Sequence, residues 1–276
     1  MKHSIHTALV VILIVSFAAG LIEADVPIPF SLKRGIPEIE VIINDSIKAT
    51  FVIDTGADHV YIDKTFAEKH GLLSGRTQPM RPTRGSKGVT ESKLIKVESL
   101  KFGENAFRDI SVVAIDLVSQ IKDTSMGYPD GILGSNFLRT FPFILDYVHY
   151  QIRFQALRKA ALSATIPIEL RRHFIIVKVT INDSVKTKMI LDTGSSYTIL
   201  TPNVARSLGL AGNQSHNSLV NVTLDKKYTI KEVVFLIRDI SEFGADSEIG
   251  GIIGTTFLQE SVLFINWDSK ELWFDH

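Results

Sequence analysis

The hydrophobic and polar positions of the chain form the same pattern twice. Residues 38–43 alternate and then run apolar, as in a half-buried strand, and residues 47–53 return as a second strand after an Asn-Asp-Ser turn. Residues 173–181 and 185–191 repeat this hairpin 138 residues later, with the same turn between them. Because strand length, turn and register all coincide, the pattern predicts an internal duplication.

Three further elements occur in both halves of the chain. They are a short helix closed by glycine, an apolar-apolar-glycine segment followed by Phe-Leu, and a final hairpin, at residues 64–72 and 202–208, 132–134 and 252–254, and 143–154 and 263–274. Closely spaced strands with only short helical patches predict an all-β fold. We expect two tandem lobes, at residues 27–157 and 165–276, joined by a short linker.

Composition narrows the possible functions. Of the 276 residues, 45% are hydrophobic and 22% charged, which suffices for two packed cores. The net charge is zero, so nothing indicates a nucleic-acid partner. The chain has no cysteine, which excludes disulfides, thiolate metal sites and thiol nucleophiles. The eight histidines show no metal-binding spacing, so we expect no metal and no cofactor.

The first residues have the features of a targeting segment. Lys2 precedes an apolar run over residues 8–22, and small residues follow it. That run is shorter than the roughly 20 residues that a membrane-spanning helix needs, so residues 1–24 are expected to be a signal peptide. The alternative is an uncleaved N-terminal anchor, in which case the protein would contact the membrane. Both predict an exported protein, periplasmic or secreted, and the lack of disulfides favours the periplasm.

Each returning strand ends at an aspartate, Asp54 in the first half and Asp192 in the second, and Thr-Gly follows both. If the halves pair about an approximate twofold axis, the two carboxyl groups come together. Two such groups share a proton and titrate as a pair. The pair then offers one base, which can activate a water, and one acid, which can protonate a carbonyl oxygen. This combination can hydrolyse an amide without a metal or a covalent intermediate.

The two motifs, Asp54-Thr55-Gly56-Ala57-Asp58 and Asp192-Thr193-Gly194-Ser195-Ser196, resemble those of the pepsin/retropepsin superfamily of aspartic proteases. The apolar-apolar-glycine segments resemble the strands that support the active-site loops in that superfamily. The resemblance implies two retropepsin/pepsin-like lobes related by a pseudo-twofold axis, with the active site in the cleft between them. It also implies a peptide or protein as substrate. Two complete lobes on one chain favour a monomer over a dimer that pairs like lobes.

The resemblance also implies roles for individual residues. Catalysis is expected from Asp54 and Asp192, support of the catalytic loops from Thr55, Gly56, Thr193, Gly194 and Ser195, and substrate contacts from Ala57, Asp58 and Ser196. Thr55 and Thr193 would interlock the two loops. Ser195 would donate a hydrogen bond to the carboxylate of Asp192, which favours Asp192 as the charged member of the pair. For Asp58, a local salt bridge is the alternative to substrate contact, and His59 could reach the cleft.

A mobile flap is expected in the first lobe. Gly85, Ser86, Lys87 and Gly88 form a glycine-flanked tip that could close over a substrate, and a plain hairpin turn is the alternative. The second lobe lacks such a tip. The first lobe also has 18 more residues between its two motifs, partly within residues 117–128, which could border the cleft. The sequence therefore predicts an exported aspartic endopeptidase. The alternative is a non-catalytic protein that binds peptides or other ligands on the same scaffold.

Overall fold

The fold is described from a computed structural model of the chain. It describes residues 26–74, 78–79, 83–85, 88–120, 127–154, 164–210 and 219–275. Within these ranges, no helix is both long and apolar enough to cross a membrane. The predicted leader, residues 1–24, lies outside them.

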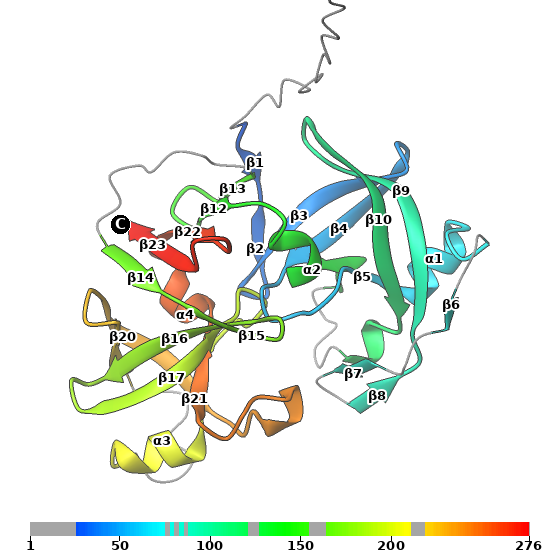
Figure 1. Ribbon diagram of the computed structural model, residues 1–276. Coiled ribbons are helices and arrows are strands. Elements are labelled where there is room, and N and C mark those ends of the chain that lie inside the picture. Colours follow the sequence, from blue (N-terminus) through cyan, green and yellow to red (C-terminus); the bar gives the residue numbers. More distant parts are fainter. Residues whose placement is uncertain are drawn as a thin grey trace, which may run out of the picture.

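The structure consists of two β-rich lobes that lie side by side (Figure 1). In the first lobe an eight-stranded sheet has the order β2-β3-β4-β11-β5-β10-β9-β6. Its strands are β2 (Ser31–Lys33), β3 (Ile36–Ile43), β4 (Ile47–Ile53), β5 (Tyr61–Asp63), β6 (Gln78–Pro79), β9 (Lys93–Phe102), β10 (Asn105–Ile115) and β11 (Gly131–Leu133). A separate hairpin joins β7 (Thr83–Gly85) to β8 (Gly88–Thr90), and the helices are α1 (Lys64–Lys69), η1 (Val118–Gln120) and α2 (Ser135–Leu138).

The second lobe has the same plan with one strand fewer in its sheet, in the order β15-β16-β17-β21-β18-β20-β19. Its strands are β15 (Glu169–Arg171), β16 (Phe174–Ile181), β17 (Val185–Leu191), β18 (Thr198–Leu200), β19 (Leu219–Leu224), β20 (Tyr228–Ile237) and β21 (Ile249–Ile253). Its helices are α3 (Pro202–Ser207), η2 (Ser241–Phe243) and α4 (Thr255–Leu258). Both lobes therefore contain the hairpin, short helix and supporting strand that the sequence predicts.

The supporting strands fix the ends of the hairpins that carry the aspartates. In the first lobe β11 runs parallel to β4, with Leu133 opposite Ile53. In the second lobe β21 runs parallel to β17, with Ile253 opposite Leu191. All four of these side chains are fully buried. Each aspartate thus follows a strand that is hydrogen-bonded on both edges, which leaves the loop after it little freedom.

The final hairpin predicted for each half of the chain is present in both lobes. The two hairpins pair with each other in one six-stranded sheet, β1-β13-β12-β22-β23-β14, to which both lobes contribute. Its strands are β1 (Ile28–Pro29), β12 (Phe143–Asp146), β13 (Gln151–Phe154), β14 (Ala164–Pro167), β22 (Val262–Asn266) and β23 (Glu271–Asp275). At its centre Leu145 lies opposite Leu263, and both are fully buried. One hydrophobic cluster therefore runs from lobe to lobe through this sheet.

Candidate active site

The two loops that carry Asp54 and Asp192 begin in the same way. The backbone N–H of Asp54 donates to the carbonyl of Leu133 at 3.0 Å, and that of Asp192 donates to the carbonyl of Ile253 at 3.0 Å. The next turn of each loop is held as well, because Ser135 N–H donates to Ala57 and Thr255 N–H donates to Ser195, both at 2.8 Å. Corresponding backbone contacts in the two lobes orient both aspartates toward the pseudo-twofold axis.

Four buried hydrogen bonds join the two loops. Thr55 Oγ1 donates to the carbonyl of Leu191 at 2.9 Å and accepts from the N–H of Thr193 at 3.1 Å. Thr193 Oγ1 donates to the carbonyl of Ile53 at 2.7 Å and accepts from the N–H of Thr55 at 3.0 Å. Both threonines are fully buried. The interlocking that the resemblance implied is therefore present in the geometry of this chain.

Each glycine of the motifs faces the aspartate of the other lobe. A Cβ placed on Gly56 would lie 2.6 Å from Cγ of Asp192, and one placed on Gly194 would lie 2.3 Å from Cγ of Asp54. No side chain fits there, so only glycine allows the opposite carboxyl group to come this close. The structure thus brings Asp54 and Asp192 together across the axis, and a hydrogen bond links their carboxyl groups. Both residues remain partly exposed, so solvent reaches the pair.

The surroundings of the two carboxyl groups differ. Burial raises the pKa of both. For Asp54 this is partly offset by Asp192 and by the N–H groups of Gly56 and Ala57, which donate to Oδ1 at 2.8 and 2.9 Å. Asp192 Oδ1 accepts from Gly194 at 2.9 Å, and the charge of Asp54 raises the pKa of Asp192 further, well above its usual value. The raised pKa favours Asp192 as the protonated member of the pair, whereas the sequence-based prediction favoured it as the charged member.

Ser195 does not make the hydrogen bond that was expected to favour the charged form of Asp192. Its hydroxyl donates to the carbonyl of Tyr197 at 2.8 Å instead of to Asp192. Ser195 supports the loop through its backbone, because its N–H donates to the carbonyl of Asp192 at 3.3 Å. The hydroxyl of Ser196, expected to contact substrate, donates to the carbonyl of Arg34 in the first lobe at 2.6 Å. Both serines therefore stabilise the backbone around the dyad through hydrogen bonds to carbonyl groups.

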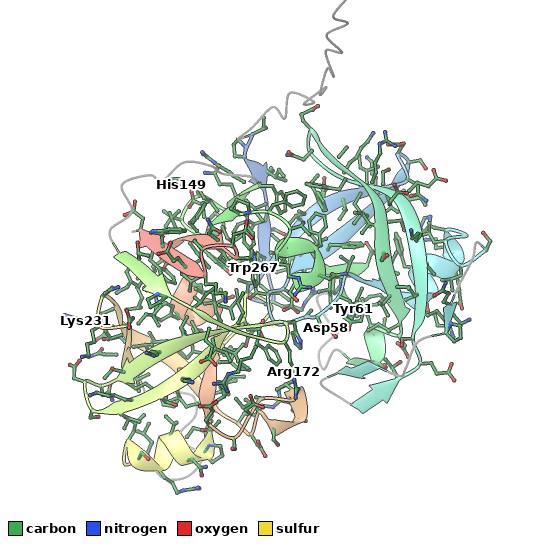
Figure 2. All side chains as sticks on the ribbon, viewed as in Figure 1. Asp58, Tyr61, His149, Arg172, Lys231 and Trp267 are labelled. Carbon is green, nitrogen blue, oxygen red and sulfur yellow. The ribbon has the colours of Figure 1, made fainter. Side chains whose placement is uncertain are left out.

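Asp58 borders the dyad within a polar cluster that Figure 2 places where the lobes meet. It accepts hydrogen bonds from the Tyr61 hydroxyl and from Nδ1 of His59, the latter at 3.1 Å. Burial alone would raise the pKa of Asp58, but these contacts outweigh it and lower the pKa to about 2. From the second lobe the His173 ring forms a hydrogen bond with the backbone of Gly56. Asp58 thus has the local ion pair weighed from the sequence, and its contact with substrate stays a prediction.

Several residues of this region could not be found from motifs. Tyr61 stands in an apolar strand that reads as core, His173 directly precedes another such strand, and Arg34 lies in a turn before the first motif. The spacing of the repeat could have identified the two arginines, because Arg34 and Arg172 are 138 residues apart, as the two aspartates are.

The flap prediction falls on the β7–β8 hairpin, in which Gly85 pairs with Gly88. Ser86 and Lys87 lie outside the described residues, and a role of this hairpin in binding stays a prediction.

A family model described as aspartyl protease matches residues 39–137 and 177–241, more than half of the chain. The chain belongs to this family. Both matched segments contain one Asp-Thr-Gly motif and its hairpin. No curated protein matches the chain.

The fold of this aspartyl protease family member is also that of a solved enzyme. The crystal structure of the aspartic proteinase from Irpex lacteus superposes with a TM-score of 0.59, covering 90% of this chain and 96% of that one. At 10% sequence identity this likeness concerns the fold alone. It extends over both lobes, as predicted. Among the described residues no group of three or more His, Asp or Glu could hold a metal ion.

Proposed function

We propose that this protein is an aspartic endopeptidase that cleaves peptide bonds with a water held between Asp54 and Asp192. The observation that carries the proposal is the pair itself. Two carboxyl groups from equivalent loops meet across the interlocked threonines, linked by a hydrogen bond and reached by solvent. Structural turn aspartates would not need a glycine opposite each carboxyl group.

We assign the roles from the surroundings of the two carboxyl groups, since Oδ1 of Asp54 accepts from two backbone N–H groups and Oδ1 of Asp192 accepts from one. Ionised Asp54 takes a proton from the water, whose oxygen attacks the carbonyl carbon of the substrate. Asp192 gives its proton to the carbonyl oxygen, and a tetrahedral diol forms without a charged oxyanion. The proton on Asp54 then passes to the leaving nitrogen as the C–N bond breaks, and a diol proton returns to Asp192 as the new carboxyl group forms. Each aspartate ends in its starting state.

The test is digestion of a mixed peptide library by the purified protein, with products identified by mass spectrometry. Asp54→Asn and Asp192→Asn are each expected to lower the cleavage rate by about 10²- to 10⁴-fold, the usual contribution of general acid–base catalysis. The control, Asp109→Asn, changes an exposed carboxylate in β10 and should cleave normally. Cleavage at the unchanged rate by either dyad variant would show that the dyad is not the catalyst.

The alternative is a protein that binds peptides on this scaffold without cleaving them. It predicts no turnover by the unmodified protein, together with measurable binding of extended peptides. A peptide mimic that has a central hydroxyl in place of the scissile carbonyl separates the two. A peptidase should bind it more tightly than the matched amide peptide, because it resembles the tetrahedral diol. A pure binding protein should not distinguish them.

Export of the protein is part of the proposal. It is supported by the apolar run at residues 8–22 with Lys2 before it. N-terminal sequencing of the mature protein tests it, since removal of residues 1–24 or a shorter leader is the expected result. An intact N-terminus in the membrane fraction would indicate an anchor, and an intact N-terminus in the cytoplasm would contradict export.

We also propose that the protein is a monomer. Measurement of the mass of the active species in solution tests this proposal.

A further inference from the structure

In each lobe a short hairpin lies before the strand that leads to the aspartate, β2–β3 in the first lobe and β15–β16 in the second. The turn of each hairpin contacts the aspartate-carrying loop of the other lobe. In the first lobe the turn of that hairpin contains Arg34, and in the second it contains Arg172, 138 residues later. Both arginines have a left-handed backbone, with φ of 53° and 56°. The carbonyl of Arg34 accepts from Ser196 in the second lobe, and His173, next to Arg172, binds the backbone of Gly56 in the first. The two turns therefore flank the dyad on opposite sides.

The side chain of Arg34 is fully engaged within its own lobe. It forms an ion pair with the carboxylate of Glu38, and its NH1 donates to the carbonyl of Gly127 at 2.8 Å. The side chains of Arg34 and Glu38 are only 14% and 2% exposed. On this side of the dyad, a protein carboxylate therefore neutralises the guanidinium and covers it.

The side chain of Arg172 keeps one of these two contacts. Its NH1 donates to the carbonyl of Gly244 at 3.4 Å, and Gly244 has a φ of 76°, close to the 74° of Gly127. The position equivalent to Glu38, however, is Ile176, which is buried among apolar side chains. The second lobe thus has the arginine and its turn at the repeated positions and a glycine carbonyl as a partner, but it has an apolar side chain where the first lobe has the carboxylate. Arg172 is exposed, unlike Arg34.

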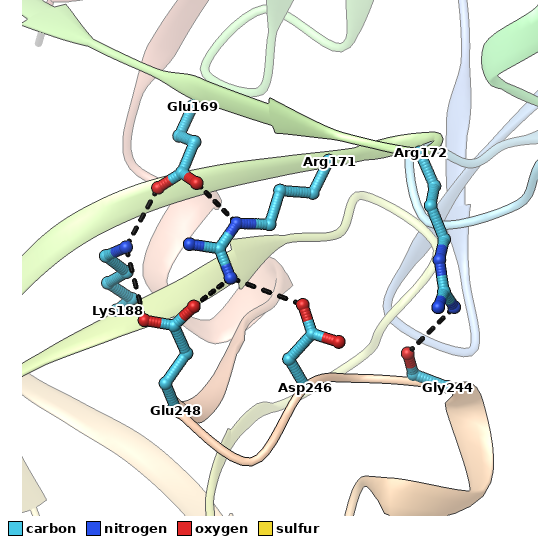
Figure 3. A network of polar contacts seen from close by, with 7 residues as sticks. All are labelled: Glu169, Arg171, Arg172, Lys188, Gly244, Asp246 and Glu248. Atoms are coloured by element: carbon cyan, nitrogen blue, oxygen red, sulfur yellow. Dashed lines mark hydrogen bonds and ion pairs between the residues drawn. The ribbon is translucent and has the colours of Figure 1, made fainter.

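The acidic residues near Arg172 are bound elsewhere, as Figure 3 shows. Its neighbour Arg171 pairs with three of them, and Lys188 pairs with two of the same three. These acids are Glu169, Asp246 and Glu248. In the part of the chain that the structure describes, none pairs with Arg172. This network also holds the loop that carries Gly244 against β15, so that the carbonyl that orients Arg172 is fixed in place.

The carboxylate of Asp58, which lies across the lobe junction, does not neutralise Arg172 either. Figure 2 shows Arg172 and Asp58 on the two sides of the lobe junction. Asp58 is the acid that borders the dyad here, but Tyr61 and His59 already donate to its two oxygens. The guanidinium of Arg172 therefore presents donors for a planar anion and lacks the carboxylate that its counterpart has.

We propose that Arg172 is a specificity-determining residue that binds a carboxylate of the peptide substrate on the side of the dyad bordered by Asp58. This inference rests on the proposed peptidase function. The substrate carboxylate would supply to Arg172 the negative partner that Glu38 supplies to Arg34. An extended peptide advances about 3.3 Å per residue, and the turn lies one residue from the contact with Gly56, so the acid belongs within about three residues of the scissile bond. The substrate class is an acidic peptide.

The test uses pairs of peptides that differ only by Glu or Gln at one position, each with a free or an amidated C-terminus. The unmodified protein should cleave the better Glu peptide with a kcat/KM about tenfold above that of its Gln partner, a ratio typical of a partly exposed charge-assisted hydrogen bond. Arg172→Gln should bring this ratio close to one, and Arg172→Glu should favour Lys over Gln at the same position. If the C-terminal carboxylate is the group bound, amidation instead of the Gln change should produce the loss.

Arg206→Gln is the matched control, because Arg206 is an exposed arginine on α3 of the same lobe. It should leave the Glu-to-Gln ratio as it was. The inference would be overturned, with the peptidase left intact, if Arg172→Gln leaves the preference unchanged. It would also be overturned if the unmodified protein distinguishes neither Glu from Gln nor a free from an amidated C-terminus. If no peptide is cleaved, the peptidase proposal fails, and the same peptide pairs are compared by fluorescence anisotropy for binding to Asp192→Asn. If Asp192→Asn binds the two peptides of a pair with different affinity, and the additional change Arg172→Gln removes that difference, the carboxylate site is supported. Equal binding of both peptides to Asp192→Asn would refute it.

Discussion

Thr55 and Thr193 bind each other's backbone in a reciprocal way, each donating to one carbonyl and accepting from one N–H across the lobe junction. Because both side chains are fully buried, no water can replace a lost partner. The carboxyl groups that precede these threonines depend on this contact for their relative position.

We expect Thr55→Ala to destabilise the protein and to reduce cleavage. The change leaves the N–H of Thr193 and the carbonyl of Leu191 without partners, and each unpaired buried group costs about 1–3 kcal/mol. Thr55→Ser keeps the hydroxyl and is the matched control. Denaturant unfolding measures the difference between the two variants, and equal stabilities would mean that the hydroxyl contributes nothing.

Gly56→Ala should abolish most of the activity because the new methyl group would meet Cγ of Asp192 at 2.6 Å. A displacement of a reacting group by about 1 Å costs on the order of a hundredfold in rate. Gly71→Ala is an instructive control. Gly71 has a φ of 70° with open space around it, so alanine there costs roughly 1–2 kcal/mol of stability and should leave the rate per folded molecule unchanged. Similar rate losses in both variants would point to general destabilisation instead of displacement of the dyad.

The raised pKa of Asp192 predicts how stability changes with pH. A carboxyl group with a higher pKa in the folded state holds its proton more tightly there than in the unfolded chain. Its contribution is therefore fully present below the unfolded pKa of about 3.9 and is lost as the pH rises through the folded pKa. Asp192→Asn removes this loss, so its Tm should fall less than that of the unmodified protein between acid and neutral pH. Glu104→Gln, which changes an exposed carboxylate, is the control, and parallel Tm curves for Asp192→Asn and the unmodified protein would contradict the assignment.

Asp58 should behave in the opposite sense. Its pKa of about 2 lies below the unfolded value, so its contribution is present above the unfolded pKa and is lost as the pH falls through about 2. Tyr61→Phe removes one of the hydrogen bonds that lower this pKa and should shift the titration of the Asp58 carboxyl carbon, followed by NMR, to higher pH. Tyr128→Phe is the control, since Tyr128 is exposed. An unchanged Asp58 titration in Tyr61→Phe would mean that His59 alone sets the pKa.

Much of the architecture could be predicted because the duplication repeats local signals. The strands ending at Ile53 and Leu191 have the predicted bounds, and the helix predicted from Pro202 begins there. The pairing of β12 with β22 could not be predicted, because nothing within either hairpin specifies which edge meets a partner so far along the chain. The orientation of the Ser195 hydroxyl could not be predicted for a similar reason. A nearby carbonyl and a nearby carboxylate are equivalent acceptors until the backbone between them is known.

The shared six-stranded sheet has a consequence for the timing of activity. Its central pair joins β12 to β22, and β22 and β23 come after every other described element of the second lobe. Contacts between segments so far apart in sequence form late, because the loop-closure entropy must be overcome first. A nascent chain can therefore fold its first lobe around Asp54, but it has no second carboxyl group locked opposite until synthesis has passed β23. If the protein cleaves peptides as proposed, the division of the dyad between two lobes delays that activity until β22 and β23 have been synthesised.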